Sequence, residues 1–335
     1  MALTDALPEM QREIRFFPVK NDEPKHLSKA QVEQYNTQGY VCPLHVFTPE
    51  EAVANRRYFD EMMEKAKAAG HNSYSINGWH RHCKGIYDLL HDRRILDYVE
   101  DLIGPNLVSV MTHYFSKDPG DSKQVSWHQD ASYWPLTPSK VVTIWLAIDD
   151  VQEQTGPMTV IPGSHLHGQI PFEHSTEEEQ NVLGQSVHDP LKWGGEPVPF
   201  IMQAGQISMH TDMLLHGSRP NLSDRRRCGL TLRYMPPDVR TREERRANGY
   251  ICRGEDPEAE AVAEHYEEAR QLLPGRLCPL WGLDPVSGSL DADDYEVLTG
   301  SPYPEGAFGE TIPKHRLFAF PFFGAACGFA PTCFS

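Results

Sequence analysis

The fold is decided by runs such as LVSVMTHYF (residues 107–115) and VVTIWLAI (residues 141–148). Both are rich in β-branched and aromatic residues, and both are short for helices. Similar runs lie between residues 106 and 235, separated by turn-forming residues: QVSWH (124–128), MTVIP (158–162), VPFIMQ (198–203), QISMH (206–210) and CGLTLRYM (228–235). Several short strands with Pro and Gly between them predict an antiparallel sandwich or barrel.

The sequence before this region favours helices. Residues 28–36 indicate a short helix, and residues 39–47 indicate a strand pair or a bent strand. Between residues 48 and 70, an N-cap threonine, a proline at the first helical position and a final glycine predict a long helix. A further helix is expected over residues 86–102, because the apolar residues there fall on one face.

Two segments differ from the rest of the chain. Residues 165–197 are polar and poor in strand-forming residues, which predicts a long insertion that is either functional or mobile. The last hundred residues form a separate compositional zone with charged, helical patterns and an apolar end broken by Pro and Gly. We therefore predict a domain over residues 1–236, with its β core at about 104–236. An extension over residues 237–335 would pack on the same domain as a lid or as an interface of a homo-oligomer.

Composition excludes several classes of partner. The 335 residues include 47 Asp and Glu and 31 Lys and Arg, which gives a formal net charge of −16. A surface with this net charge repels phosphate backbones and anionic lipids. We therefore expect neither nucleic acid nor membrane as a partner. No apolar run approaches the ~18 residues that span a bilayer. The seven cysteines lack framework spacing and indicate free thiols, so a soluble, cytoplasmic protein is expected.

Three residues have the types and spacing of a metal site. His128 and Asp130 are two residues apart, and residues at i and i+2 of a strand point to the same face. His216 follows 88 residues later (216 − 128), at the end of another short strand. Two histidines and one carboxylate, with other positions open, suit a non-haem Fe(II) that activates oxygen. An H-x-D pair alone is common on protein surfaces, and His210 is a rival ligand to His216.

An arginine in the right place strengthens this interpretation. Arg227 lies 11 residues after His216 (227 − 216), so the two could come from neighbouring strands joined by a turn at NLSD. A guanidinium there could bind a carboxylate bidentately, deep inside a barrel. Arg225 and Arg226 are alternatives within the same run, but the spacing favours Arg227.

Three blocks of sequence then resemble the phytanoyl-CoA dioxygenase family of Fe(II)/2-oxoglutarate oxygenases. They are HQDASYWPL (128–136), VVTIWLAIDDVQEQTGPMTVIPGSH (141–165) and LLHGSRPNLSDRRRCGLTLRYM (214–235). The blocks occur in the family's order, and the resemblance runs from about residue 28 to residue 236. It implies a mainly β fold with flanking helices. The core would be a double-stranded β-helix (jelly roll, cupin-like), with N-terminal helices outside it and a C-terminal extension.

The resemblance also implies roles for single residues. His128, Asp130 and His216 match the iron ligands, which are also the catalytic residues. Arg227 matches the arginine that pairs with the distal carboxylate of 2-oxoglutarate. Further positions match cosubstrate contacts, although the register before His128 is loose: Ser218, Trp145, Met111 and Lys84. Core packing is an equal alternative for the tryptophan and the methionine, and a solvated side chain is the alternative for the lysine.

The substrate side is less defined. Tyr133, Trp134 and His113 are predicted to contact the substrate, with packing inside the protein as the alternative for each. Because Asp130 keeps the carboxylate that related halogenases replace with a small residue, the expected reaction is hydroxylation of a C–H bond.

The resemblance implies that 2-oxoglutarate and dioxygen are cosubstrates and that succinate and CO2 are released. We expect a small-molecule substrate, either a specialised metabolite or an amino-acid-like compound. The open alternatives are desaturation, epimerisation, cyclisation, endoperoxide formation, an acyl-CoA substrate, and a non-catalytic jelly-roll binding module.

Overall fold

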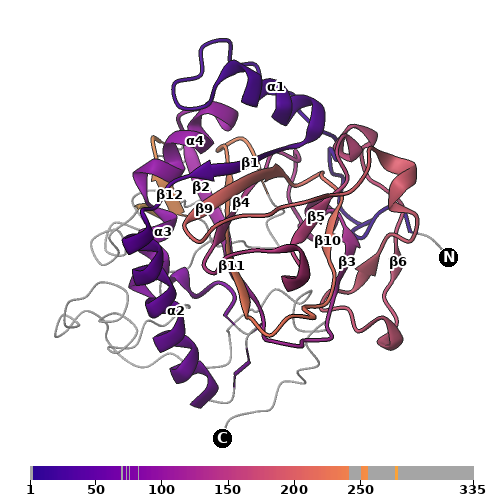
Figure 1. Cartoon of the computed structure of the whole chain (residues 1–335). Coiled ribbons are helices and arrows are strands. Elements are labelled where there is room, and N and C mark those ends of the chain that lie inside the picture. Colours follow the sequence, from indigo (N-terminus) through magenta and orange to yellow (C-terminus); the bar gives the residue numbers. More distant parts are fainter. Residues whose placement is uncertain are drawn as a thin grey trace, which may run out of the picture.

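The computed structural model describes residues 3–68, 71–72, 74, 76–81, 83–240, 250–255 and 276–277. Within this part, the chain is mainly β with flanking helices (Figure 1). Most of the predicted extension over residues 237–335 lies outside the described residues, and so does its predicted role as a lid or interface. No helix among the described residues is long and apolar enough to cross a membrane.

Four helices occupy the N-terminal third of the chain: α1 (Lys29–Gln38), α2 (Pro49–Ala68), α3 (Lys84–Leu90) and α4 (Arg93–Ile103). The first begins at Ser28, whose side chain accepts a hydrogen bond from the backbone N–H of Gln31 in a capping box. The prediction of one helix over residues 86–102 is wrong, because two helices cover this stretch. Asp92 separates them by capping α4, where its carboxylate accepts the N–H of Arg94.

The larger sheet has seven antiparallel strands in the order β1-β9-β4-β11-β2-β12-β13. Their bounds are β1 (Tyr40–His45), β2 (Leu107–Lys117), β4 (Val142–Ala147), β9 (Gln206–Thr211), β11 (Arg227–Met235), β12 (Tyr250–Arg253) and β13 (Arg276–Leu277). β1 has a register shift between Val41 and Leu44, in agreement with the bent strand predicted there. β12 pairs with β2, so the sheet recruits residues beyond position 236.

The smaller sheet has four strands in the order β3-β10-β5-β8. They are β3 (Val125–His128), β5 (Met158–Val160), β8 (Val198–Pro199) and β10 (His216–Ser218). β8 uses only two residues of the predicted run 198–203, and its Pro199 has no N–H to donate to a neighbouring strand.

Short elements complete the fold. β6 (Glu173–His174) and β7 (Gln185–Ser186) pair with each other inside the predicted insertion. A one-turn helix, α5 (Asp130–Tyr133), follows β3. The 3-10 helices are η1 (Trp79–Arg81), η2 (Glu153–Thr155), η3 (Ser164–His167), η4 (Glu177–Glu179) and η5 (Pro190–Trp193).

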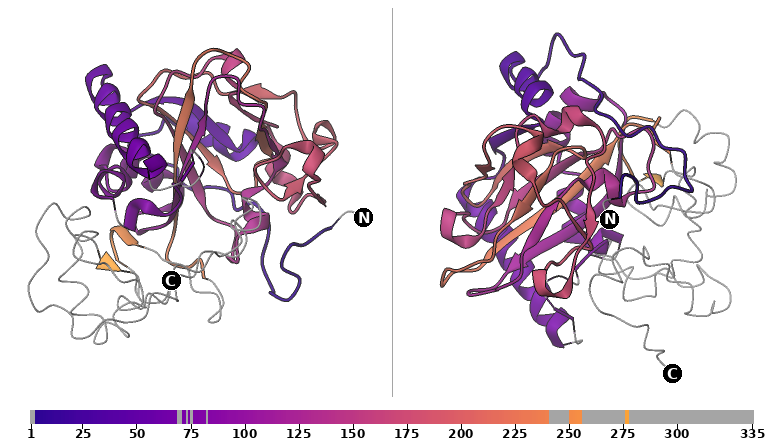
Figure 2. Two further views of the ribbon diagram at one scale, coloured as in Figure 1. Left: turned by 90° about the horizontal axis from the view of Figure 1, so that it is seen from below. Right: turned by 90° about the vertical axis from the view of Figure 1, so that its right-hand side faces the viewer.

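The larger sheet is covered on both faces. In Figure 2 (left), helices α2 to α4 lie on one side of the strands, and the segment containing β6 lies on the other. On β4, Ile144 and Leu146 pack into the cluster formed with these helices, whereas Trp145 lies in a different cluster with Val160 of the smaller sheet. Alternate residues of a strand point to opposite faces, so each strand of this sheet contributes one row of side chains to the space between the sheets.

β11 shows what occupies that space. Its even-numbered residues, such as Leu230 and Leu232, pack against the helices. Its odd-numbered residues face the smaller sheet and include Arg227, Thr231 and Arg233, all of which line one cavity. Polar side chains at buried, inward positions are costly to the fold and indicate a binding site.

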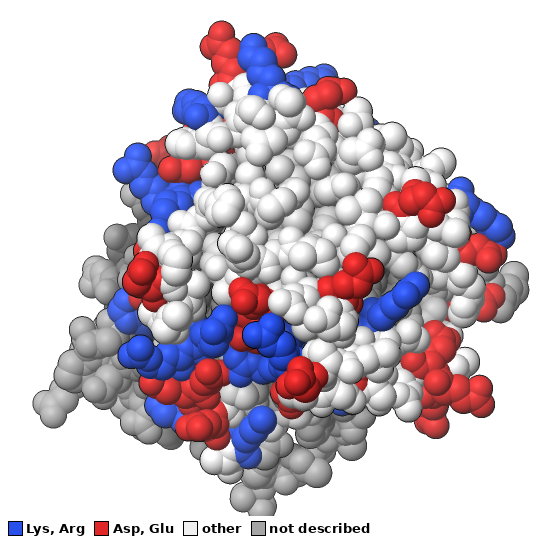
Figure 3. Space-filling model, in the orientation of Figure 1, with Lys and Arg blue, Asp and Glu red and all other residues white. Residues whose placement is uncertain are grey.

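The face of the molecule seen in Figure 3 carries basic and acidic side chains next to each other, below a largely uncharged centre. Ion pairs join Arg226 to Asp149 and to Asp60, and Arg56 to Asp149. Basic and acidic side chains are thus interspersed on this face (Figure 3).

Candidate metal centre and cosubstrate pocket

His128, Asp130 and His216 meet between the two sheets. β3 and β10 pair with His128 directly opposite His216, and Asp130 begins α5 immediately after β3 rather than lying on the strand itself. One ligand atom from each of the three residues lies within 4.8 Å of the others, and all three side chains are buried. In the described part of the chain, no other set of three His, Cys, Asp or Glu side chains has this geometry.

Hydrogen bonds orient both imidazole rings toward Asp130. His128 Nδ1 lies 2.7 Å from the carbonyl oxygen of Ser126, and His216 Nδ1 lies 2.9 Å from that of Leu214. A carbonyl oxygen only accepts, so each Nδ1 carries a proton and each Nε2 keeps a free lone pair. The Nε2 atoms are 3.7 Å and 4.0 Å from Asp130 Oδ1. Metal-binding histidines are held in this way, and the donor set fits Fe(II).

The buried carboxylate remains ionised. Burial alone would raise the pKa of Asp130, but Arg233 and the two histidines outweigh this effect and hold the pKa well below its usual range. Burial also lowers the pKa of His216 well below its ordinary value, so this imidazole is neutral at pH 7. The carboxylate and the neutral imidazole are in the protonation states that a divalent cation requires.

Arg227 supplies a buried cation on the same cavity. Its Nη2 donates to the carbonyl of Gly156 at 2.9 Å and its Nη1 to that of Phe115 at 3.4 Å. The guanidinium carbon lies 5.6 Å from the centre of the Trp145 ring. Among the described residues, no acidic side chain forms an ion pair with Arg227, and its Nε has no hydrogen-bond partner. A buried guanidinium in this state is suited to bind a ligand carboxylate.

A second buried basic side chain, Lys117, was not predicted from the sequence. It lies opposite Arg227 in the register of β2 and β11, and both side chains line the cavity. Its Nζ donates to the carbonyl of Arg219 and lies 3.1 Å from the carbonyl oxygen of Lys123 and 3.3 Å from that of Ser218. Burial, and then the charge of Arg227, lowers the pKa of Lys117 to about 6. The available signal in the sequence was a lysine that closely follows the strand-forming run of residues 107–115.

Binding of an anion beside Lys117 should take up protons. At pH 7.5 the free amine is mostly neutral, and a bound dianion raises its pKa toward the usual range. The affinity for 2-oxoglutarate should therefore fall as the pH rises above about 6, by up to about tenfold per unit. Calorimetry in buffers of different ionisation enthalpy should show net proton uptake. Lys117→Met should abolish the uptake, whereas Lys84→Met should preserve it; persistent uptake in the first variant would refute the assignment.

Three further predicted residues lie at the cavity. Ser218 and Trp145 line it beside Arg227. Tyr133 also lines it: its hydroxyl accepts the backbone N–H of Gln185 at 3.0 Å, and its ring lies 5.7 Å from that of His128.

The other predicted residues do not line this cavity. Met111 and Trp134 belong to an apolar cluster, and the tryptophan ring lies under the guanidinium of Arg233. His113 Nε2 donates to the carbonyl of Tyr74 at 3.0 Å, so this histidine orients the backbone. Lys84 lies at the start of α3, where it forms a 2.6 Å ion pair with Asp88. At these positions the structure therefore shows the alternatives given above, which were packing inside the protein or, for Lys84, a solvated side chain.

Gly229 keeps Trp145 in place. A Cβ atom at Gly229 would lie 2.0 Å from a ring atom of Trp145, so only glycine fits there. Gly229→Ala should displace the indole from Arg227, lower the affinity for 2-oxoglutarate, and destabilise the protein by about 1–3 kcal/mol.

Thermal unfolding and calorimetric titration would measure both effects. Gly195→Ala is the matched control, because its Cβ would meet its nearest neighbours at 3.8 Å. A destabilised Gly229→Ala protein that binds 2-oxoglutarate as tightly as the wild type would contradict the role given to Trp145.

Arg233 was also not predicted from the sequence, in which His210 is a rival ligand to His216. Arg233 Nε lies 3.6 Å from Asp130 Oδ2, and Thr143 donates to the same oxygen at 3.3 Å. The ring of His210 lies 4.9 Å from that of His216, but His210 is outside the group of three ligands. Burial lowers the pKa of His210 to about 4. An arginine within the apolar run CGLTLRYM was the signal that could have identified Arg233.

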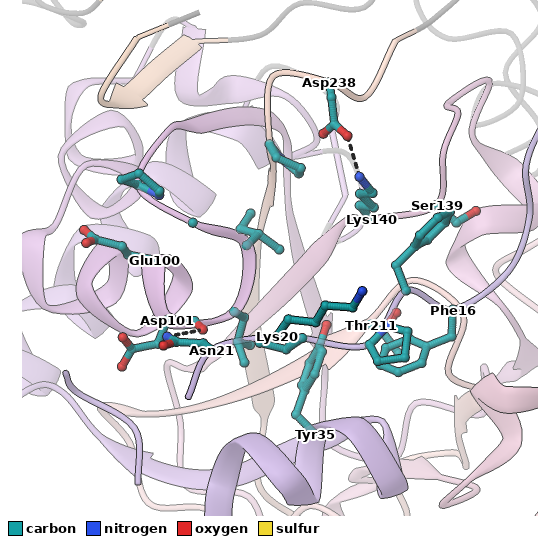
Figure 4. A pocket seen from close by; sticks show the side chains of 18 of the residues that line it. Phe16, Lys20, Asn21, Tyr35, Glu100, Asp101, Ser139, Lys140, Thr211 and Asp238 are labelled. Atoms are coloured by element: carbon teal, nitrogen blue, oxygen red, sulfur yellow. Dashed lines mark hydrogen bonds and ion pairs between the residues drawn. The ribbon is translucent and has the colours of Figure 1, made fainter. Parts of the chain in front are cut away.

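A second hollow lies away from the triad, between the N-terminal segment and the end of α4 (Figure 4). Several of its polar groups are already paired with one another. Lys140 forms an ion pair with Asp238, and the side chain of Asn21 donates to the carbonyl of Asp101 at 3.0 Å (Figure 4). The cavity around the triad, with its unpaired buried groups, is therefore the better candidate for the functional site.

Comparisons with known proteins agree with this geometry. "Phytanoyl-CoA dioxygenase, peroxisomal" of Bos taurus is 30% identical over 145 residues, which cover 42% of this chain and 43% of the relative. "Probable alpha-ketoglutarate-dependent hypophosphite dioxygenase" of Stutzerimonas stutzeri is 28% identical over 163 residues, covering 48% of this chain and 56% of the relative. The chain thus spans about half the length of these curated relatives.

A solved structure and a family model complete the comparison. The structure of "non-heme monooxygenase; ThoJ apo" is 28% identical, with a TM-score of 0.58, and the match covers 67% of this chain and 84% of that chain. The family model "Phytanoyl-CoA dioxygenase (PhyH)" matches residues 35–229. This range holds 195 of the 335 residues (229 − 35 + 1) and includes the triad and Arg227. The chain therefore belongs to the phytanoyl-CoA dioxygenase (PhyH) family.

Proposed function

We propose that this chain is an Fe(II)- and 2-oxoglutarate-dependent dioxygenase that hydroxylates a C–H bond of a small molecule and releases succinate and CO2. The observation that carries the proposal is the buried group of His128, Asp130 and His216, with both Nε2 lone pairs free. Arg227 adds an unpaired cation for the distal carboxylate of 2-oxoglutarate on the same cavity. The family's relatives named as dioxygenases support the same activity.

Each residue has a defined task in this proposal. Iron, when bound, supplies the oxidation chemistry with 2-oxoglutarate and dioxygen as cosubstrates. The two imidazoles and the carboxylate of Asp130 would hold the metal, and the backbone carbonyls at Nδ1 fix the ring orientations. Arg227, which lies beside Trp145, would bind the distal carboxylate of the cosubstrate. The apolar side chains that line the cavity, among them Tyr133 and Leu183, keep water out.

The finer features of the fold and setting belong to the same proposal. The facing seven- and four-stranded sheets support a double-stranded β-helix, or jelly-roll, core. The domain boundary at residue 236, a cytoplasmic location and a homo-oligomer formed through the extension rest on the sequence alone.

The test is succinate formation. Purified protein, loaded with Fe(II) under argon and then exposed to air with 2-oxoglutarate, should release succinate, and a chelator should stop the release. A panel of metabolites, including amino acids and acyl-CoA thioesters, should contain compounds that accelerate it. A protein that binds neither metal nor 2-oxoglutarate would instead be a jelly-roll binding module.

Product mass distinguishes the oxidative outcomes. A gain of one oxygen atom supports hydroxylation, and a loss of two hydrogen atoms supports desaturation or cyclisation. An unchanged mass with inverted configuration supports epimerisation, and a gain of two oxygen atoms supports an endoperoxide.

A further inference from the structure

Arg233 is a buried arginine whose hydrogen-bonding capacity is mostly unused. It is 3% exposed and lines the same cavity as the triad. Its Nη1 donates to Thr231 Oγ1 at 2.8 Å, but its Nε has no hydrogen-bond partner and lies 3.6 Å from Asp130 Oδ2. Within the described residues, no hydrogen bond is formed by Nη2. A guanidinium has five N–H donors, so most of this group's donors remain available to a ligand.

Arg12 shows how an arginine with a structural role differs. Its Nη1 donates to the carbonyls of Ala131 and Trp134, each at 2.9 Å, and its Nη2 pairs with Asp5. Arg12 therefore joins the N-terminal segment to the loop after β3 and has partners on both amino groups. Arg233 has neither a carbonyl cage nor an acidic partner at hydrogen-bond distance in the described part of the chain.

A charge count shows what the loaded site lacks. Fe(II) would bring two positive charges, and Arg227 and Arg233 bring one each. Asp130 contributes one negative charge and 2-oxoglutarate two, so the loaded site would have a net charge of +1, and a protonated Lys117 would raise it. A buried, unmatched charge is unfavourable unless a counter-ion joins it. Arg227 is assigned to the cosubstrate, and the charge of Asp130, which lies 3.6 Å from Arg233, is shared with the metal, so the unmatched charge lies at Arg233.

The two arginines are placed to bind different molecules. They are six residues apart on the inward face of β11, which separates their Cα atoms by roughly 20 Å. Arg233 approaches the metal ligand Asp130, whereas Arg227 lies over Trp145 at the Lys117 end. His210 also lines the cavity, and neither of its ring nitrogens has a hydrogen-bond partner within the described residues. Donors and acceptors thus remain for a second ligand.

We propose that Arg233 binds an acid group of the substrate, so that the substrate is a small molecule carrying a carboxylate close to the C–H bond that is oxidised. The planar fork of the guanidinium matches a carboxylate in two parallel hydrogen bonds. His210, on β9, adds a polar contact from another strand that lines the cavity. This inference rests on the proposed function, because it takes the metal and 2-oxoglutarate as present.

The test compares acids with their amides. Protein loaded with Zn(II), which does not support the oxidation, and saturated with 2-oxoglutarate is titrated with matched pairs, followed by ligand-observed NMR. The probes are acetate and acetamide, hexanoate and hexanamide, and 3-phenylpropanoate and 3-phenylpropanamide. The acids should bind at least about tenfold more tightly than the amides. The free energy of one charge-assisted hydrogen-bonded pair in a buried site corresponds to this difference in affinity.

Substitutions show which residue causes the preference for acids over amides. Arg233→Met should reduce it to less than about twofold, and Arg233→Lys should retain part of it, because the charge stays and the fork is lost. Arg253→Met is the matched control, since Arg253 is paired with Asp97 and Glu100 at the edge of the larger sheet. This control should keep the full preference. Circular dichroism shows whether each variant is folded. If Arg233→Met does not fold, the comparison is made with Arg233→Lys.

The outcomes separate the inference from the proposed function. Wild-type protein that binds neither Zn(II) nor 2-oxoglutarate overturns the proposed function. Protein that binds both but prefers no acid overturns only the inference. An acid preference that survives in Arg233→Met also overturns it. If Arg233→Met weakens metal binding and leaves the preference unchanged, Arg233 acts on Asp130 alone.

Discussion

Replacing His216 with alanine should lower the affinity for Fe(II) by about 100-fold or more, and His128→Ala should do the same. Each variant removes one of three ligand atoms that lie within 4.8 Å of one another. Two remaining ligands hold a divalent cation weakly, and succinate release should fall to background. Anaerobic equilibrium dialysis with metal analysis gives the affinity directly, without dependence on turnover.

His210→Ala is the informative comparison, because His210 is buried beside His216 and is its rival in the sequence. The geometry leaves His210 outside the ligand group, so this variant should bind Fe(II) within about threefold of the wild type. Both substitutions remove a buried imidazole, so effects on folding are matched and thermal unfolding can verify this. Loss of metal from His210→Ala, with retention in His216→Ala, would reverse the ligand assignment.

Replacing Arg227 with methionine should lower the affinity for 2-oxoglutarate about 30-fold or more. Truncating one partner of a buried charge pair costs at least about 2 kcal/mol, which corresponds to this factor. Metal affinity should be unchanged, because Arg227 does not contact the triad. Calorimetric titration of 2-oxoglutarate into Zn(II)-loaded protein separates the two effects.

The stability of the ligand-free protein gives a second measurement. Arg227 is buried without an acidic partner in the described part of the chain, so replacing it with an apolar side chain should change the free energy of unfolding by less than about 1 kcal/mol. 2-Oxoglutarate should then raise the melting temperature of the wild type but not of the variant. Arg225→Met is the control, since Arg225 is exposed. An equal loss of affinity in that variant would show that the register of the arginine run is wrong.

The prediction that His128, Asp130 and His216 act together rests on local evidence, and the structure brings the three side chains close to one another. His128 and Asp130 are two residues apart, and a short turn leads from His216 to Arg227. The expectation that these two residues come from neighbouring strands is wrong, because β10 belongs to the smaller sheet and β11 to the larger one, and the two sheets face each other across the site. The strands on either side were also visible, because a sheet that is buried on both faces reads as a continuous apolar run, as in β4.

The cavity residues that the sequence did not predict have a common physical cause. Lys117 and Arg233 become site residues only because β2 and β11 pair in one register and turn their odd-numbered side chains inward. Which face of a strand points inward depends on packing against the other sheet, which a single strand does not encode. Lys84 and Met111 were predicted to contact the cosubstrate from their positions before His128, but they do not line the cavity. Before His128, the lengths of the loops break the relation between spacing in the sequence and distance in space.

The sequence by itself therefore indicated the strand-rich core and, with the family resemblance, the residues proposed to bind the metal and the cosubstrate, since both depend on patterns along the chain. The tertiary structure decided which side chains surround that centre. It brought Lys117 opposite Arg227, closed Trp145 over Gly229 and turned Arg233 toward Asp130. The reason is that these neighbours are set by sheet register and by the contact between two sheets, and both arise only when distant strands pair.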